Sequence, residues 1–123
     1  MTDTARPETA VDSYAPTTPV QVDSTADYHE LIEAHDLVLL EFVTSGCGIC
    51  ASMEPVLGTV ARSAPGSVAI ANAGLVPDLA GEFGVRTVPT LVVLKDGTEV
   101  ERLDDGFQGA ETLVEVLETH AER

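Results

Sequence analysis

The chain contains two cysteines, Cys47 and Cys50, and they stand three positions apart. Two thiols at this spacing can carry out disulfide exchange. One sulfur attacks the disulfide of a partner, and the second attacks the resulting mixed disulfide and releases the partner. The pair follows an apolar run, 37–43, and precedes a helical pattern, 48–63. A C-x-x-C segment between a strand and a helix is typical of redox-active dithiols.

The expected start of the helix assigns different roles to the two thiols. The first N–H groups of a helix have no partners within the helix, and the helix dipole favours negative charge there. A thiolate at this point is therefore stabilised. Cys47 falls at the expected helix start and Cys50 lies one turn further in. We therefore predict that Cys47 is the nucleophile and Cys50 the resolving thiol.

Three other interpretations of the cysteines stay open. A purely structural disulfide is one, although closing so short a loop stabilises a protein by only about 2 kcal/mol. A zinc site with His29 and His35 is another, but six residues along a helix turn a side chain by about 240° and point the two rings apart. Inert buried thiols are the third.

Glu41 interrupts the apolar run before the dithiol. A carboxylate in a core strand is costly unless it is paired or protonated, and burial raises its pKa. A carboxyl group with a pKa near neutrality could accept the proton of Cys50 as that thiol attacks. Alternatively, Glu41 points to solvent from a partly exposed strand.

The charge balance excludes some classes of function. Twenty-one acidic residues face six basic ones, which gives a net charge of −15. Binding of nucleic acid through a basic patch is excluded, because phosphate contacts need lysine and arginine. Self-repulsion of this size is also a known halophile device. We therefore expect a source with a high-salt cytoplasm, and an ordinary acidic protein is the alternative.

The apolar segments bear on location. None approaches the 18 or more residues of a membrane span, and the first residues lack the features of a secretory signal. We expect a cytoplasmic protein without membrane contact, because a C-x-x-C pair cycles in a reducing compartment. No cofactor or metal is expected, since the sulfurs themselves hold the electrons.

The pattern along the chain predicts a disordered extension over 1–21 and one domain over 22–122. Helices separated by strands imply parallel pairing, and Asp96-Gly97 is a hairpin signal that adds an antiparallel edge. The expected fold class is α/β, with a mixed, mostly parallel central sheet and helices on both faces. The expected elements are helices at 25–35, 48–63, 77–83 and 109–121 and strands at 37–43, 68–73, 90–95 and 98–103.

Four separated pieces give the chain, over about 22–122, a resemblance to the thioredoxin family. They are Glu41-Phe42, the dithiol, Pro55, and the segment 84–90 with Val88-Pro89-Thr90. The resemblance implies a thioredoxin-like fold and a thiol-disulfide oxidoreductase that reduces protein disulfides. It also implies protein disulfide clients and a separate reductase that recycles the dithiol. Oxidase or isomerase activity on the same fold, or a redox-sensing, partner-binding module, is the alternative.

The resemblance further implies a client groove beside the dithiol. The Val88–Pro89 bond should be cis and lie against the cysteines, which would turn the backbone of Val88 towards an extended client strand. Gly106 resembles the glycine that borders the same groove, although a plain turn residue is the alternative. Three further residues around the dithiol are expected to contact the client: Gly46, Gly48 and Ile49.

The chain also departs from the usual family pattern. Gly46 stands where the family usually has tryptophan, and Ile49 replaces the usual proline between the cysteines. Glu41 is one methylene longer than the usual aspartate. Ala51 and Ile70 stand where the family often has basic residues, so less positive charge should stabilise the thiolate.

Overall fold

The computed structural model describes residues 18–121. Most of the predicted extension, 1–17, lies outside these residues, as do the last two residues of the chain. The described elements follow in this order: β2 (Val20–Val22), α1 (Thr25–Ala34), β3 (Leu37–Val43), α2 (Gly48–Ser63), β4 (Ser67–Asn72), α3 (Pro77–Glu82), β5 (Thr90–Lys95), β6 (Thr98–Leu103) and α4 (Ala110–Ala121). The sequence pattern did not predict β2. Val20 and Gln21, which it assigned to a disordered extension, are in a strand.

Local signals in the sequence fix the helix starts. The Oγ of Ser24 accepts a hydrogen bond from the backbone N–H of Asp27 at 3.0 Å, which caps α1 as its sequence predicts. Pro77 occupies the first turn of α3, where its missing N–H costs nothing. Helix α2 continues through Pro55.

The five strands form one sheet in the order β2-β4-β3-β5-β6. Pairs β2/β4 and β3/β4 are parallel, whereas β3/β5 and β5/β6 are antiparallel. The predicted mixed sheet with helices on both faces is confirmed. The expectation that it is mostly parallel is wrong, because half of its pairings are antiparallel.

The short helix α3 explains the antiparallel pairing of β5. Strand β4 ends at Asn72 beside Val43, and β5 begins at Thr90 beside Phe42, so the chain leaves and re-enters the sheet at the same end. A helix of six residues is about 9 Å long, which is too short to carry the chain back along the sheet. Strand β5 must therefore run opposite to β3.

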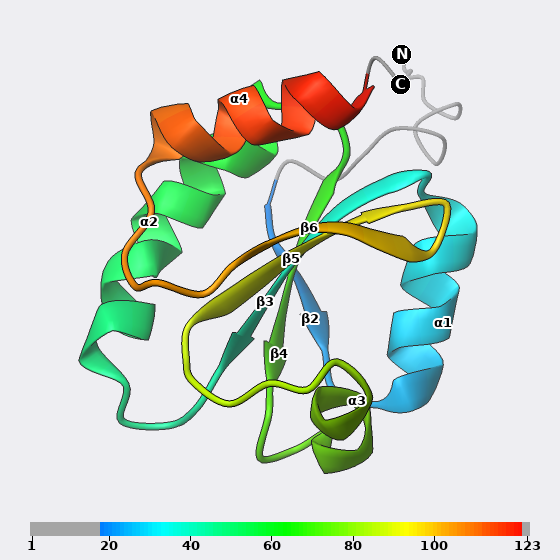
Figure 1. Ribbon diagram of the computed structural model, residues 1–123, viewed down its shortest axis with the longest axis vertical. Coiled ribbons are helices and arrows are strands. Elements are labelled where there is room, and N and C mark those ends of the chain that lie inside the picture. Colours follow the sequence, from blue (N-terminus) through cyan, green and yellow to red (C-terminus); the bar gives the residue numbers. More distant parts are fainter. Residues whose placement is uncertain (1–17, 122–123) are drawn as a thin grey trace, which may run out of the picture.

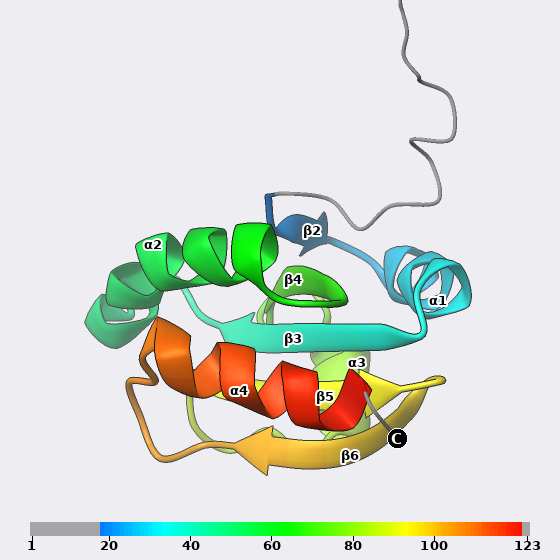
Figure 2. The same ribbon diagram turned by 90° about the horizontal axis from the view of Figure 1, so that it is seen from above.

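Helices cover both faces of the sheet, as Figure 1 shows, with α2 and α4 on one side and α1 and α3 on the other. Alternate residues of β3 serve the two faces: Val38, Leu40 and Phe42 pack in the core of α1 and α3, and Leu37 and Leu39 in that of α2 and α4. This double burial explains the continuous apolar run. Helices α2 and α4 contact each other and lie side by side in both ribbon views (Figure 2).

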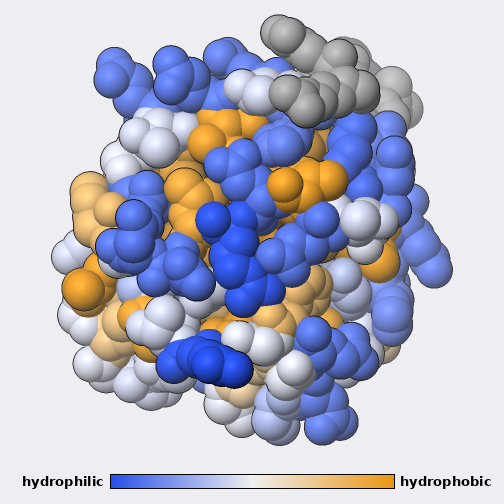
Figure 3. Space-filling model, viewed as in Figure 1, coloured by the Kyte–Doolittle hydropathy of each residue, from blue (hydrophilic) through white to orange (hydrophobic). Residues whose placement is uncertain are grey.

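The surface reflects the composition of the chain. Figure 3 shows hydrophilic residues along the upper edge, over α4, and along the right edge, over α1, with smaller apolar areas between them. Four large hydrophobic side chains are exposed in the part of the chain that the structure describes: Ile49, Leu75, Val100 and Phe107. No helix within residues 18–121 is long and apolar enough to cross a membrane.

Candidate active site

The two cysteines lie at the first turn of α2. Cys47 is the residue that caps the helix, and its Sγ accepts a hydrogen bond from the backbone N–H of Cys50 at 3.1 Å. The two sulfurs form a disulfide, and the two Cα atoms are 5.2 Å apart. Cys47 is half-buried, whereas Cys50 is 6% exposed. Cys47 is therefore the more accessible of the two cysteines, and unequal access of this kind is what stepwise disulfide exchange needs.

Glu41 lies in β3, the strand that precedes the dithiol, and is buried. Its side chain is 1% exposed, so the alternative that it points to solvent is wrong. Neither carboxylate oxygen has a hydrogen-bond partner among the described residues. Burial, and secondarily the negative charge of Glu54, raises the pKa of Glu41 from 4.5 to about 7. The carboxyl group is therefore poised to take up or release a proton at neutral pH.

A pocket of about 810 Å³ opens beside the dithiol. We call it the Glu41 pocket. It is framed by the end of β3, the start of α2 and the neighbouring β2 and β4. Its lining is Pro19, Gln21, Asp23, Glu41, Val43, Thr44, Ser45, Gly46, Cys47, Gly48, Cys50, Ala51, Glu54, Ile70, Asn72 and Leu75. The structure thus brings Glu41, both cysteines, Gly46 and Gly48 together around one hollow.

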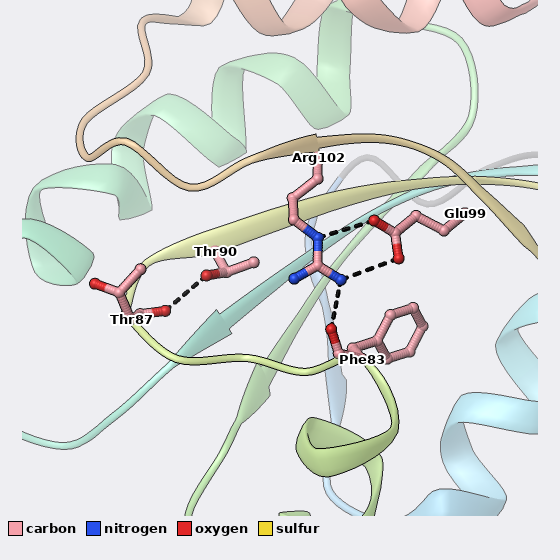
Figure 4. A network of polar contacts seen from close by, with 5 residues as sticks. All are labelled: Phe83, Thr87, Thr90, Glu99 and Arg102. Atoms are coloured by element: carbon pink, nitrogen blue, oxygen red, sulfur yellow. Dashed lines mark hydrogen bonds and ion pairs between the residues drawn. The ribbon is translucent and has the colours of Figure 1, made fainter.

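The segment before β5 forms the other flank of this end of the sheet. The Val88–Pro89 peptide bond is cis, as the resemblance implied, and Pro89 is buried. The Oγ1 of Thr90 donates a hydrogen bond of 2.6 Å to the carbonyl of Thr87, which closes the turn around this bond (Figure 4).

Arg102 on β6 holds the beginning of the same segment. Its guanidinium donates to the backbone carbonyl of Phe83, at the end of α3, and forms two hydrogen bonds of 2.8 and 3.0 Å with the carboxylate of Glu99 (Figure 4). Phe83 also packs against Phe42 with ring centroids 5.5 Å apart. The segment that carries the cis bond is therefore anchored to both β6 and the core.

Strand register brings the dithiol, the cis bond and Gly106 to one end of the sheet. Phe42 pairs with Thr90, and Leu91 pairs with Leu103, so the end of β3, the start of β5 and the end of β6 lie together.

The segment after β6 also contacts α2. The backbone N–H of Gln108 donates a hydrogen bond to the Sδ of Met53 in α2 at 3.4 Å. Gly106 has a φ of +103°. Neither it nor the cis bond lines the Glu41 pocket.

Comparison with known proteins assigns the fold and the dithiol to a family. The family model described as thioredoxin matches residues 19–119. This chain belongs to the thioredoxin family. A thioredoxin of Chlamydia muridarum is 35% identical over 102 residues, which cover 82% of this chain and 98% of that protein. A thioredoxin of Staphylococcus aureus is 35% identical over 97 residues, or 77% and 91% of the two chains.

Solved structures agree with this assignment. The N21Q mutant thioredoxin from Halobacterium salinarum NRC-1 superposes with a TM-score of 0.81 at 33% identity, covering 85% of this chain and 92% of that one. The thioredoxin of Fasciola hepatica superposes with a TM-score of 0.74 at 27% identity, covering 82% and 98%. This thioredoxin-family protein is therefore a disulfide oxidoreductase, and Cys47 and Cys50 form its redox-active dithiol.

The departures from the family pattern leave visible traces in this thioredoxin-family protein. Gly46 has a φ of +80°, a conformation that L side chains rarely adopt, and open space lies where its Cβ would be. Ile49 projects from the dithiol turn and is 47% exposed. Ile70 pairs with Glu41 across the sheet and offers it no charge.

Within residues 18–121, no group of three or more histidine, cysteine or acidic side chains could hold a metal ion.

Sequence reasoning missed two parts of this thioredoxin site. The first is the contribution of Pro19, Gln21 and Asp23 to the pocket, because a strand of three residues leaves no periodic signal. The second is the anchor formed by Arg102, whose partner is a backbone carbonyl that no motif marks. Glu54, by contrast, could have been found, since it follows Cys50 by one helical turn.

Proposed function

We propose that this thioredoxin-family protein reduces the disulfides of other proteins, with Cys47 as the nucleophile and Cys50 as the resolving thiol. The observation that carries this assignment is the unequal placement of the two sulfurs. Cys47 caps α2 and is half-buried, whereas Cys50 lies within the first turn of the helix and is buried. A client disulfide can reach the first sulfur and not the second.

The exchange proceeds in two balanced steps. The thiolate of Cys47 attacks one sulfur of the client disulfide, forms a mixed disulfide with it and displaces the other client sulfur as a thiolate. The thiolate of Cys50 then attacks the Sγ of Cys47, which forms the intramolecular disulfide and releases the second client sulfur. Two electrons pass from the dithiol to the client. Recycling requires a separate dithiol-reducing enzyme as partner.

We infer that Glu41 accepts the proton that Cys50 loses before it attacks. Glu41 and Cys50 both line the Glu41 pocket, and the raised pKa of Glu41, about 7, matches the pH at which the proton must move. A carboxyl group with its usual pKa would be too weak a base for this transfer. The proton can return to solvent through the pocket.

The proposed client surface lies around the dithiol and on the side of the cis bond. The backbone of Val88, turned outward next to Pro89, would pair with an extended client segment. Exposed Ile49 (47%) and Phe107 (54%) supply apolar contact near it. Three glycines, Gly46, Gly48 and Gly106, leave room for the backbone of the client to approach.

We further propose that the protein works in a cytoplasm of high salt content and contacts neither membranes nor nucleic acids. The net charge of −15 supports this setting. A cytoplasmic location fits a dithiol that must return to its reduced form after each turnover.

The first experiment measures reduction of insulin disulfides by the full chain in molar KCl, with dithiothreitol as electron source. Wild-type protein should accelerate it, and Cys47→Ser should abolish the acceleration. In a separate trapping experiment, Cys50→Ser should form mixed disulfides with many client proteins. Capture of a single protein would favour the redox-sensing, partner-binding module. A reduction potential nearer −120 to −180 mV than about −270 mV would contradict a reductase and indicate an oxidant or isomerase.

A further inference from the structure

The Glu41 pocket has a chemical character of its own. Three acidic residues line it, Asp23, Glu41 and Glu54, and none of the described residues that line it is basic. They come from three separate segments of the chain: Asp23 from the loop between β2 and α1, Glu41 from β3 and Glu54 from α2. A volume of about 810 Å³ falls in the range of small-molecule sites in proteins.

The buried carboxylate of Glu41 lacks hydrogen-bond donors. Both of its oxygens are buried without a hydrogen-bond partner among the described residues. A buried carboxylate that lacks a partner carries the full cost of its desolvation. A positively charged donor that enters the pocket would offset that cost, and the charge of Glu54 would add to the attraction.

Apolar side chains share the lining with the acids. Val43 and Ile70 line the pocket, and Leu75 lies exposed at it. A ligand that combines an ammonium group with a short aliphatic chain would satisfy both kinds of contact. Ammonium carries three donors and no acceptor, which suits two unpartnered carboxylate oxygens.

The sulfurs of Cys47 and Cys50 complete the lining. We propose that the Glu41 pocket binds the ammonium group of small aliphatic disulfides and so makes amine-bearing disulfides preferred low-molecular-weight substrates of the dithiol. This inference rests on the proposed function of the two cysteines. It adds a class of substrate that does not use the backbone of Val88, because neither Val88 nor Pro89 lines this pocket.

The reaction follows the same chemistry as with proteins. The thiolate of Cys47 attacks one sulfur of the disulfide and releases one aminothiol, which takes a proton from water. The second half remains as a mixed disulfide on Cys47, with its ammonium group in the pocket. With Glu41 held ionised by the ammonium group, Cys50 gives its proton to water, and its thiolate then attacks the Sγ of Cys47. The second aminothiol leaves and takes up a proton, so that the small disulfide gains the two electrons that the dithiol loses.

The binding step is tested first on the oxidised full chain, where no exchange can occur. Butylammonium chloride and butanol are titrated separately into ¹³C-labelled protein at constant ionic strength, and the carboxyl signal of Glu41 is followed by NMR. Butylammonium should shift this signal and lower the pKa of Glu41, and butanol should do neither. Equal responses to the two probes would overturn the proposal. Because no thiol reacts, this result does not depend on the proposed function.

The preference is then tested on the reduced chain in molar KCl, which screens long-range attraction. Rates are compared for cystamine, which carries two ammonium groups, and for bis(2-hydroxyethyl) disulfide, its neutral analogue. The cystamine-to-neutral ratio of the wild type should fall at least 3-fold in Glu54→Gln. It should stay unchanged in Glu118→Gln, which removes the same charge from the exposed face of α4.

Two kinetic outcomes would count against the pocket. Equal loss in both variants would assign the preference to the net charge of the protein. A preference seen only with lysine-containing peptide disulfides, and absent with cystamine, would assign the ammonium site to protein clients. If reduction of the neutral disulfide also fails, the dithiol function itself is in error, and the NMR titration still decides the pocket.

Discussion

The backbone N–H of Cys50 points at the Sγ of Cys47 across the first turn of α2, 3.1 Å away. The side chain of Cys47 thus occupies the place where a serine or aspartate caps an ordinary helix. After reduction, the same N–H and the positive end of the helix dipole face the sulfur that must become the nucleophile. One local contact therefore both begins the helix and prepares its cap for chemistry.

The two thiols should react in a fixed order. When the reduced chain is treated with less than one equivalent of iodoacetamide at pH 7, Cys47 should be alkylated at least 10-fold faster than Cys50. The reasons are that Cys47 is less buried than Cys50 and that the helix start stabilises its thiolate. Peptide mass spectrometry measures the two products. Unfolding in guanidinium chloride is the control and should remove the difference, and modification of Cys50 first would reverse the assigned roles.

Glu41 should make stability depend on pH in a definite direction. Its pKa is 4.5 when unfolded and about 7 when folded, so the folded state holds the proton more tightly. The contribution is fully present below pH 4.5 and is lost as the pH rises through about 7. At about 1.4 kcal/mol per pKa unit, the loss amounts to about 3 kcal/mol.

Glu41→Gln isolates this effect, because glutamine does not titrate. Urea unfolding of the oxidised chain at a series of pH values should show the wild type losing stability relative to the variant between pH 4.5 and 8. Parallel curves for the two proteins would contradict a raised pKa. In the reduced chain, the same variant should slow resolution of the mixed disulfide by Cys50 and leave the first attack by Cys47 unchanged.

Arg102 should anchor the segment that leads to the cis bond. Arg102→Ala removes the hydrogen bond to the carbonyl of Phe83 and leaves that carbonyl without its side-chain partner. We expect a loss of about 1 to 2 kcal/mol in the free energy of unfolding, measured with urea. Glu99→Gln is the matched control, because it weakens the exposed ion pair and should cost less than about 1 kcal/mol. Equal losses would place the stabilisation in the ion pair instead.

Gly66 should tolerate no side chain. Its φ is +90°, and a Cβ there would lie 2.7 Å from the carbonyl oxygen of Leu37. Gly66→Ala should therefore destabilise the protein by about 2 kcal/mol or more in urea unfolding. Gly81→Ala in α3 is the control: a Cβ there meets nothing within 4 Å, and alanine should stabilise the helix by about 0.5 to 1 kcal/mol. Similar effects of the two changes would refute the close approach.

Salt should stabilise the folded chain. The net charge of −15 means that the acidic side chains repel one another, and salt screens this repulsion. The Tm should therefore rise from dilute buffer to molar KCl. A triple change of Glu111, Glu115 and Glu118 to lysine brings the net charge to −9 and should flatten that rise. Differential scanning calorimetry measures both. A Tm of the wild type that stays level or falls with salt would remove the support for a high-salt setting.

The sequence alone determined the elements and the chemistry that depends on neighbours in the chain. Strand β3 and helix α2 have the predicted bounds, because a continuous apolar run and a 3.6-residue period are local signals. The roles proposed for Cys47 and Cys50 come from their order along a helix start. The apolar neighbours of Glu41 favoured its burial but left a solvent-facing side chain open, and the structure decided for burial.

Tertiary structure decided what depends on segments far apart in the chain. The antiparallel pairing of β5 follows from the path of the chain around α3, and β2 exists only because β4 offers it an edge. The Glu41 pocket gathers Asp23, from the loop before α1, and Glu54, from α2, in the lining that also holds Glu41. No periodic pattern in the sequence predicts that these acidic residues lie together. Their proximity depends on strand order and on which face of α2 turns towards the sheet.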